Sequence, residues 1–154
     1  MITEKMVNIH MVIIFGVCLA FGIINIASGA AAIGVVTLLM GIVVPAAVYF
    51  VKKKASLTLC GTILSQAQLI TIILISTAKH ELHYMFPLML ASMSIAAIYY
   101  SHRNLIIHWV IMDAASVLGL IFRSAFYADA DMGFLIKGLL GLNIGAALIC
   151  YLIK

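Results

Sequence analysis

Residues 7–51 read VNIHMVIIFGVCLAFGIINIASGAAAIGVVTLLMGIVVPAAVYFV and contain no aspartate, glutamate, lysine or arginine. This run is far longer than the roughly 20 residues that one helix needs to cross a bilayer. A single kinked or tilted helix of that length would be too long for one crossing. The small residues Ser28, Gly29 and Ala30 interrupt the run. We therefore predict two membrane-spanning helices joined by a tight turn at these three residues.

The rest of the chain has the same apolar character. Of its 154 residues, 66% are hydrophobic and 9% are charged, and the mean hydropathy is +1.25. Soluble domains carry about 25% charged residues. We therefore predict one integral membrane domain over residues 1–154, an all-α polytopic bundle with no soluble domain beside it. Six spans are expected, at residues 7–28, 30–51, 57–77, 84–101, 105–125 and 132–153.

The basic residues predict the orientation of these spans. With six spans, Lys5, the lysine run at residues 52–54, Arg103 and Lys154 all fall on one side. Lysine and arginine are enriched in cytoplasmic loops, so both termini are expected in the cytoplasm. The net charge of +4 is scattered over loop edges rather than gathered on one helix face, which argues against a nucleic-acid partner. The lysine run reads as a stop-transfer flank in contact with anionic lipid.

Polar side chains inside the third predicted span include Gln66 and Gln68. Lipid offers them no hydrogen-bond partner, so they must bond to neighbouring helices or line a ligand cavity or water-filled path. The same alternatives apply to Asn25 and Asn143. The third helix is therefore expected to be central in the bundle.

Asp113 is the deepest charged residue in the predicted spans. At 1.5 Å per residue it lies about 12 Å along its helix from Leu105, near the bilayer centre. It must be protonated, hydrogen-bonded or paired there. One interpretation is a neutral carboxyl bonded to Gln66, Gln68 or Ser116. The other is a proton-coupled or cation-binding group.

Ionisable residues also gather where the predicted third to sixth spans meet the outer surface. We call this set the outer cup, and its members are His80, Glu81, His83, Arg123, Asp129, Asp131 and Lys137. Opposite charges there either neutralise one another and pin the helix ends, or bind a small polar ligand whose carboxylate the cations hold. The HELH sequence lacks the HExxH spacing of metalloproteases, so interfacial capping is favoured over a structural metal. We expect no metal and no other cofactor.

Other reactive residues predict no chemistry. The cysteines are isolated within predicted spans and are read as reduced apolar fillers, at Cys18, Cys60 and Cys150. His10 and His108 could in principle be axial haem ligands, but interhelical hydrogen bonding or exposure at the membrane interface is favoured for both. No nucleophile and base occur at a recognisable spacing, so an enzyme is not expected.

Glycines near one face of the sixth span, at positions 138, 141 and 145, allow close helix approach. They predict packing inside the bundle or, alternatively, a homodimer seam.

A resemblance to a known class of membrane domain covers the third to fifth spans. It lies in His80-Glu81-x-His83-Tyr84-Met85-Phe86, in an apolar helix ending at Ile98-Tyr99-Tyr100, and in the turn His102-Arg103-Asn104. This pattern is similar to the membrane sensor region of bacterial signalling proteins, which include methyl-accepting chemoreceptors and related cyclic-dinucleotide or kinase proteins.

The resemblance implies a multi-pass sensor of the bacterial inner membrane. It would detect an extracytoplasmic or intramembrane signal and pass it to a cytoplasmic signalling partner. His80, Glu81 and His83 would match the outer polar motif, and Tyr99 the inner aromatic. The chain departs from the pattern in two ways. Pro87 is expected to interrupt the start of the fourth helix, and the sequence ends where an output domain would begin. The chain is then either an excised membrane domain or a stand-alone protein.

A small-solute transporter component is the alternative. Its size and span count are similar to those of the substrate-binding membrane subunits of vitamin importers, and Asp113 would suit a dimeric proton-linked exporter. Adjacent genes for ATPase subunits would favour the importer.

Overall fold

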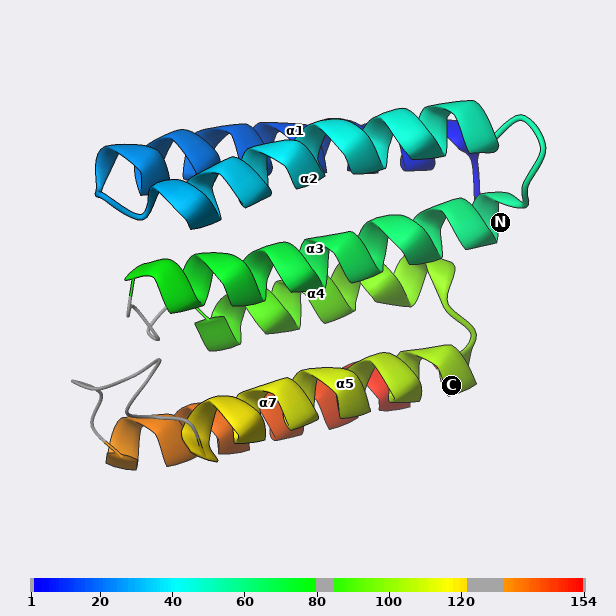
Figure 1. Ribbon diagram of the computed structural model, residues 1–154. Helices are drawn as coiled ribbons and strands as arrows, with labels where there is room; N and C mark the ends of the chain where they lie inside the picture. The colour runs from blue at the N-terminus through cyan, green and yellow to red at the C-terminus, as the bar shows by residue number, and fades with distance from the viewer. Residues whose placement is uncertain (1, 80–84, 122–131, 154) are drawn as a thin grey trace. The chain divides into compact units, whose positions relative to one another are not determined.

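The computed structural model describes residues 2–79, 85–121 and 132–153, and all of its regular structure is helical (Figure 1). The helices in chain order are α1 (Glu4–Ala27), α2 (Ala31–Val51), α3 (Leu57–Lys79), α4 (Met85–Tyr99), α5 (His102–Ile121) and α7 (Met132–Leu152). No strand occurs in these described residues. The predicted all-α class is therefore confirmed, as expected where lipid cannot satisfy backbone polar groups.

Four of the described helices are long and apolar enough to cross a membrane. They are Glu4–Ala27, Ala31–Val51, Leu57–Ile75 and Met132–Leu152. The apolar helix α4 is shorter, with 15 residues. Large apolar side chains such as Val12, Phe50 and Ile144 are more than two thirds exposed, at 70%, 74% and 71%. Such a surface suits lipid rather than water. The helices therefore support the prediction of a membrane protein. The number of crossings and the orientation remain predictions.

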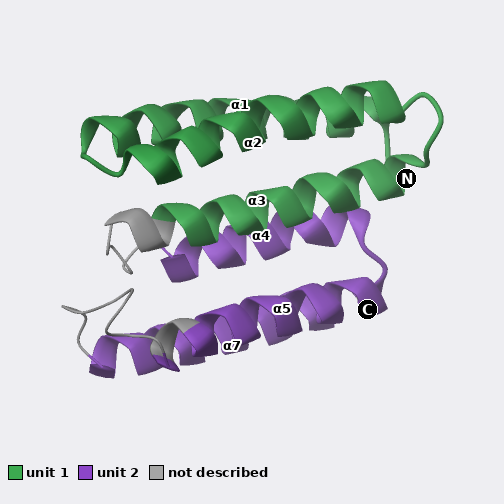
Figure 2. Ribbon diagram, in the orientation of Figure 1, with its two compact units in different colours: residues 1–78 green, residues 79–154 purple. Residues whose placement is uncertain are grey.

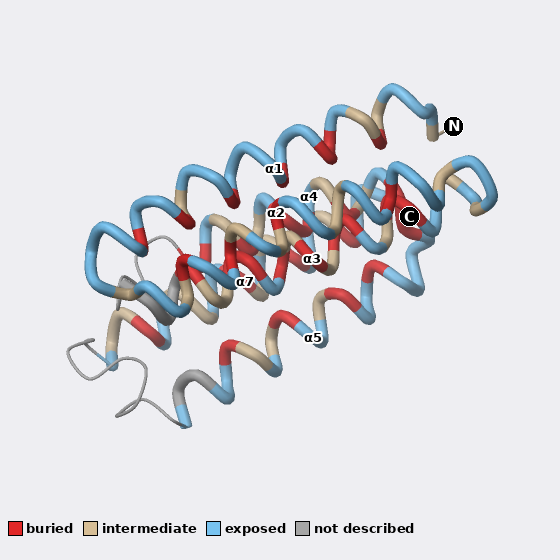
Figure 3. The backbone as a smooth tube through the Cα atoms, turned by 45° about the horizontal axis from the view of Figure 1, so that its top comes forward, coloured by how far each residue is buried: buried red, intermediate tan, exposed pale blue. Residues whose placement is uncertain are grey.

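The described chain forms two compact units, residues 1–78 and 79–154 (Figure 2). The first contains α1, α2 and nearly all of α3, and the second contains α4, α5 and α7. Buried positions return about once per turn along α1 and α5 (Figure 3). Each helix therefore turns one face inward and leaves the others to the surroundings.

In the first unit, the predicted tight turn is confirmed. Helix α1 ends at Ala27 and α2 begins at Ala31. Gly29 adopts φ +87°, a conformation that side-chain-bearing residues rarely take. Close packing follows the turn, because a Cβ on Gly34 would stand 2.7 Å from the backbone oxygen of Gly22. Small residues thus let α1 and α2 pack almost backbone to backbone.

In the second unit, glycines of α7 receive side chains of α4. A Cβ on Gly145 would lie 2.7 Å from Leu90, and one on Gly138 would enter the Phe86 ring. Gly141 has nothing within 4 Å of that position, because it lies off the stripe that the other two share at a seven-residue spacing. The predicted packing inside the bundle is confirmed for Gly138 and Gly145.

Pro87 does not interrupt the described helix α4, contrary to expectation. The described residues of this helix run from Met85 to Tyr99 and include Pro87.

Candidate functional site

Three side chains of the second unit form a polar cluster between α5 and α7. Asn143 Nδ2 donates a hydrogen bond to Asp113 Oδ1 at 2.7 Å. Trp109 Nε1 donates to Asn143 Oδ1 at 3.0 Å. Asn143 Nδ2 also donates to the backbone oxygen of Leu139 at 3.0 Å. We call Trp109, Asp113 and Asn143 the α5–α7 cluster.

Helix geometry places the α5 members together. Trp109 and Asp113 are four residues apart, so their side chains lie one above the other on one face of α5. Asn143 lies on α7 one turn beyond Leu139. All three members are half-buried. Both the oxygen and the NH₂ group of the Asn143 amide are therefore used. These hydrogen bonds fix how far α7 can slide along α5.

The chemistry of this cluster follows from its setting. A carboxyl group at membrane depth needs a donor, because lipid has none. A hydrogen bond to an ionised carboxylate is about twice as strong as a neutral one. Asn143 supplies that donor, and its oxygen at the same time satisfies the indole N–H. The arrangement gives the Asp113 carboxyl group a hydrogen-bond donor from a neighbouring helix.

The partner of Asp113 differs from those that the sequence predicts. Ser116 Oγ donates to the Met112 oxygen at 2.9 Å and lies 3.5 Å from Met89 Sδ. Gln68 Oε1, which can only accept, lies 2.8 Å from His10 Nε2. Asn143 is visible in the sequence as a polar residue in a span, but no spacing connects it to Asp113, because the two lie on different helices.

Two more contacts in the first unit concern predicted residues. The His10 to Gln68 bond joins α1 to α3, which confirms the interhelical hydrogen bond predicted for His10. Cys18 Sγ lies 3.6 Å from Thr71 Oγ1 on the same pair of helices. Gln66 is half-buried on α3.

The three cysteines are free and buried, as predicted. In the second unit, the His108 ring packs edge-on against Tyr100 with centroids 5.5 Å apart. Tyr99, the inner aromatic of the resemblance, is buried at the end of α4.

Most of the outer cup falls outside the described residues. This applies to His80, Glu81, His83, Arg123, Asp129 and Asp131. Lys137 is described and lies exposed on α7, about two turns before Asn143. Within the described parts of the chain, no three His, Cys, Asp or Glu side chains gather to hold a metal ion. The cup as a ligand site therefore stays a prediction.

Lys52 forms an anchor that the sequence does not reveal. Its Nζ lies 2.9 Å from Glu4 Oε1, 2.7 Å from Asn8 Oδ1 and 4.9 Å from the Tyr49 ring centroid. Glu4 begins α1, precedes the predicted span at residues 7–28, and has an exposed side chain. The hydrogen bond from Lys52, and then its charge, lower the pKa of Glu4. This anchor joins the first turn of α1 to the end of α2.

Comparison with known proteins yields no relative, because no protein-family model, curated protein or solved structure matches this chain.

Proposed function

We propose that this chain is a membrane-embedded sensory module of the bacterial inner membrane. In this proposal it crosses the bilayer six times with both termini in the cytoplasm. It detects a small polar ligand at its outer face and transmits the signal to a cytoplasmic partner. The sequence resemblance at His80–Phe86 and Ile98–Asn104 supports this role. The structural observation that carries it is the α5–α7 cluster, which gives two helices of one unit a defined relative position.

The α5–α7 cluster suggests how a signal would travel. Lys137 and Asn143 lie on the same helix, six residues or about 9 Å apart. A ligand held by Lys137 therefore acts on the helix whose position Asn143 sets. In this proposal a shift of α7 along α5 breaks the Asn143 hydrogen bonds, so the bonded arrangement is one state and the shifted arrangement is the other. The ligand biases these arrangements only by its difference in affinity for them.

The ligand site is tested by binding. The full chain in lipid nanodiscs is screened by thermal shift against amino acids and dicarboxylates, and any hit is titrated by calorimetry. Glu81→Gln, Arg123→Gln and Lys137→Gln are expected to weaken binding of the hit by tenfold or more, the cost of removing one charge-assisted contact. Lys54→Gln is the matched control on another loop. Unchanged affinity in all three variants would reject the outer cup.

Transmission is tested separately with Asn143→Leu. This variant keeps the outer cup and removes the α5–α7 hydrogen bonds. It is expected to bind the same ligand while losing the ligand-induced change in distance between spin labels on α5 and α7. An intact distance change would remove the α5–α7 cluster from the mechanism.

The predicted topology has its own test. Single cysteines are introduced at Gly29 and Lys53 in a chain whose native cysteines are replaced by alanine. In intact cells, a membrane-impermeant maleimide is expected to label the first and spare the second. Labelling at residue 53 but not at residue 29, or equal labelling at both positions, would overturn the predicted orientation.

A proton-linked exporter is the second candidate, favoured by the half-buried carboxyl group of Asp113 on α5. In proteoliposomes, such an exporter dissipates a pH gradient when its substrate is added, and Asp113→Asn abolishes this. A sensor leaves the gradient unchanged in both proteins.

A further inference from the structure

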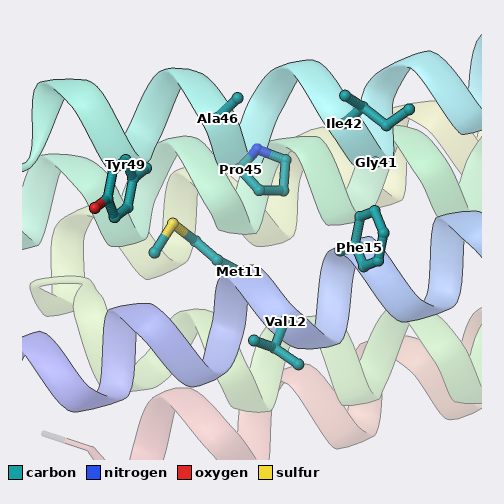
Figure 4. A pocket seen from close by; sticks show the side chains of 8 residues that line it. All are labelled: Met11, Val12, Phe15, Gly41, Ile42, Pro45, Ala46 and Tyr49. Atoms are coloured by element: carbon teal, nitrogen blue, oxygen red, sulfur yellow. The ribbon is translucent and has the colours of Figure 1, made fainter.

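An apolar groove runs along the first unit between α1 and α2 (Figure 4). Its volume is about 330 Å³. We call it the α1–α2 groove, and its side chains include Met11, Val12 and Phe15 from α1 and Pro45, Ala46 and Tyr49 from α2. Ligand pockets begin at about 300 Å³, so the groove has room for part of a chain molecule.

The sequence of α2 creates this groove. At Gly41 the two helices touch, because a Cβ there would enter the Cys18 side chain. One turn later, Pro45 has no N–H to donate to the Gly41 carbonyl, and its ring and the Ala46 methyl are short. Between Ile42 and Tyr49, the α2 residues that line the space are only Pro45 and Ala46. The helices therefore stay paired while the surface between them is hollow.

The walls of the groove face the surroundings of the helices. Val12, Phe15 and Tyr49 are 70%, 45% and 51% exposed, while Met11 at 8% forms the floor. From Gly41 to Tyr49 the groove extends about 12 Å along α2. One leaflet of hydrocarbon is about 15 Å deep. An acyl chain lying along the helices would match this length and this apolar lining.

Positive charge collects at the Tyr49 end. Lys52 follows Tyr49 by one turn, and Lys53 and Lys54 come next and are exposed. On α1, Lys5 is exposed and lies seven residues before Val12, on the same helix face. Glu4 pairs with Lys52 and also feels the charge of Lys53, so four lysines at this end, Lys5, Lys52, Lys53 and Lys54, face one nearby carboxylate and retain excess positive charge. The groove thus joins an apolar slot to a cationic end at the depth of lipid headgroups.

We propose that the α1–α2 groove binds one anionic phospholipid from the leaflet on the lysine side. One acyl chain lies against Pro45 and Ala46, and Lys53 and Lys54 hold the headgroup phosphate. A zwitterionic lipid fills the same slot but gains less from the lysines, so selectivity comes from charge. The site is independent of the sensory role.

The test measures binding of phosphatidylglycerol and phosphatidylcholine with matched chains to the delipidated full chain by native mass spectrometry. Each lysine near a membrane surface adds about a fivefold preference for anionic lipid. Lys53→Gln with Lys54→Gln is therefore expected to weaken phosphatidylglycerol binding roughly 30-fold. Lys53→Arg with Lys54→Arg keeps the charge and should keep the affinity.

The acyl slot is tested with a matched pair on α2. Ala46 lines the groove, whereas its exposed neighbour Ala47 does not. Ala46→Leu is expected to weaken binding of both lipids, and Ala47→Leu to leave it unchanged. Equal binding in these two variants would overturn the proposal. The proposal would also be overturned if glycerol phosphate, which has the anion without the acyl chains, competed fully with phosphatidylglycerol. A dimer that forms through the groove and is abolished by Ala46→Leu would overturn it as well.

Discussion

Asn143 Nδ2 on α7 lies 2.7 Å from Asp113 Oδ1 on α5, so a carboxyl group within α5 depends on an amide from a neighbouring helix. The same amide accepts a hydrogen bond from Trp109. One residue therefore satisfies a carboxyl group and an indole N–H together. Removing it leaves both without that partner, in surroundings where lipid cannot replace it.

Asn143→Leu is expected to lower the free energy of unfolding by about 2 kcal/mol. Buried polar groups that lose their partner cost about 1–3 kcal/mol, while single interhelical bonds in membranes average about 0.6 kcal/mol. Reversible unfolding in mixed micelles measures the change. Ile144→Ala, at a neighbouring position that is 71% exposed, is the control and should cost much less. Equal costs would show that the hydrogen bonds of Asn143 do not stabilise the chain.

Asp113→Asn is expected to be milder than Asn143→Leu. The amide oxygen of the new side chain can still accept from Asn143 Nδ2, so the cost should stay below about 1 kcal/mol, the net contribution of one hydrogen bond. Combining Asp113→Ala with Asn143→Ala in a double-mutant cycle gives the coupling energy of the pair. A coupling energy of zero would contradict the contact.

Trp109 allows the α5–α7 cluster to be followed by fluorescence, because the chain contains one tryptophan. Asn143→Leu removes the acceptor of the indole N–H, so the emission maximum is expected to move to shorter wavelength. Leu140→Ala changes an exposed side chain of the same helix and should not shift it. An unchanged spectrum in Asn143→Leu would mean that the indole has another acceptor.

Gly34→Ala and Gly16→Ala should change stability in opposite directions. In a helix interior, alanine is favoured over glycine by about 0.5–1 kcal/mol. Gly16 has nothing within 4 Å of an added Cβ, whereas at Gly34 that atom stands 2.7 Å from the Gly22 backbone oxygen. Gly16→Ala should therefore be neutral or stabilising, and Gly34→Ala destabilising. Unfolding in mixed micelles compares them, and a stabilising Gly34→Ala would disprove the close helix contact.

Glu4 gives the Lys52 anchor a pH dependence. Because Lys52 lowers the pKa of Glu4 below its ordinary 4.5, the anchor is present above that value and is lost as the pH falls through the lowered pKa. A titration of the ¹³C-labelled carboxyl group should show a midpoint that rises in Lys52→Gln. Lys137→Gln, on α7, is the control and should leave it in place. The same midpoint in Lys52→Gln would show that Lys52 does not act on Glu4.

The turn at Ser28–Ala30 shows what could be predicted and why. Helix length is limited by bilayer thickness, so an overlong apolar run with small residues inside it must turn, and the structure has that turn. The partner of Asp113 could not be predicted in the same way. It depends on which helix lies beside α5, and no local spacing encodes that.

The position of Pro87 shows a second kind of error. A proline in an apolar run suggests an interruption, because it lacks an N–H and its ring crowds the preceding turn. The described helix α4 nevertheless contains Pro87 and continues to Tyr99, so the proline does not end the helix.

The sequence by itself determined that this chain is helical and apolar enough for a membrane, since those properties follow from composition and run length. Tertiary structure alone decided which polar groups meet, joining Asn143 to Asp113 and Trp109, His10 to Gln68, and Lys52 to Glu4. The physical reason is that core-facing and lipid-facing positions are both apolar. Hydrophobic periodicity then cannot tell which face of a helix meets its neighbour, and only the packed helices reveal it.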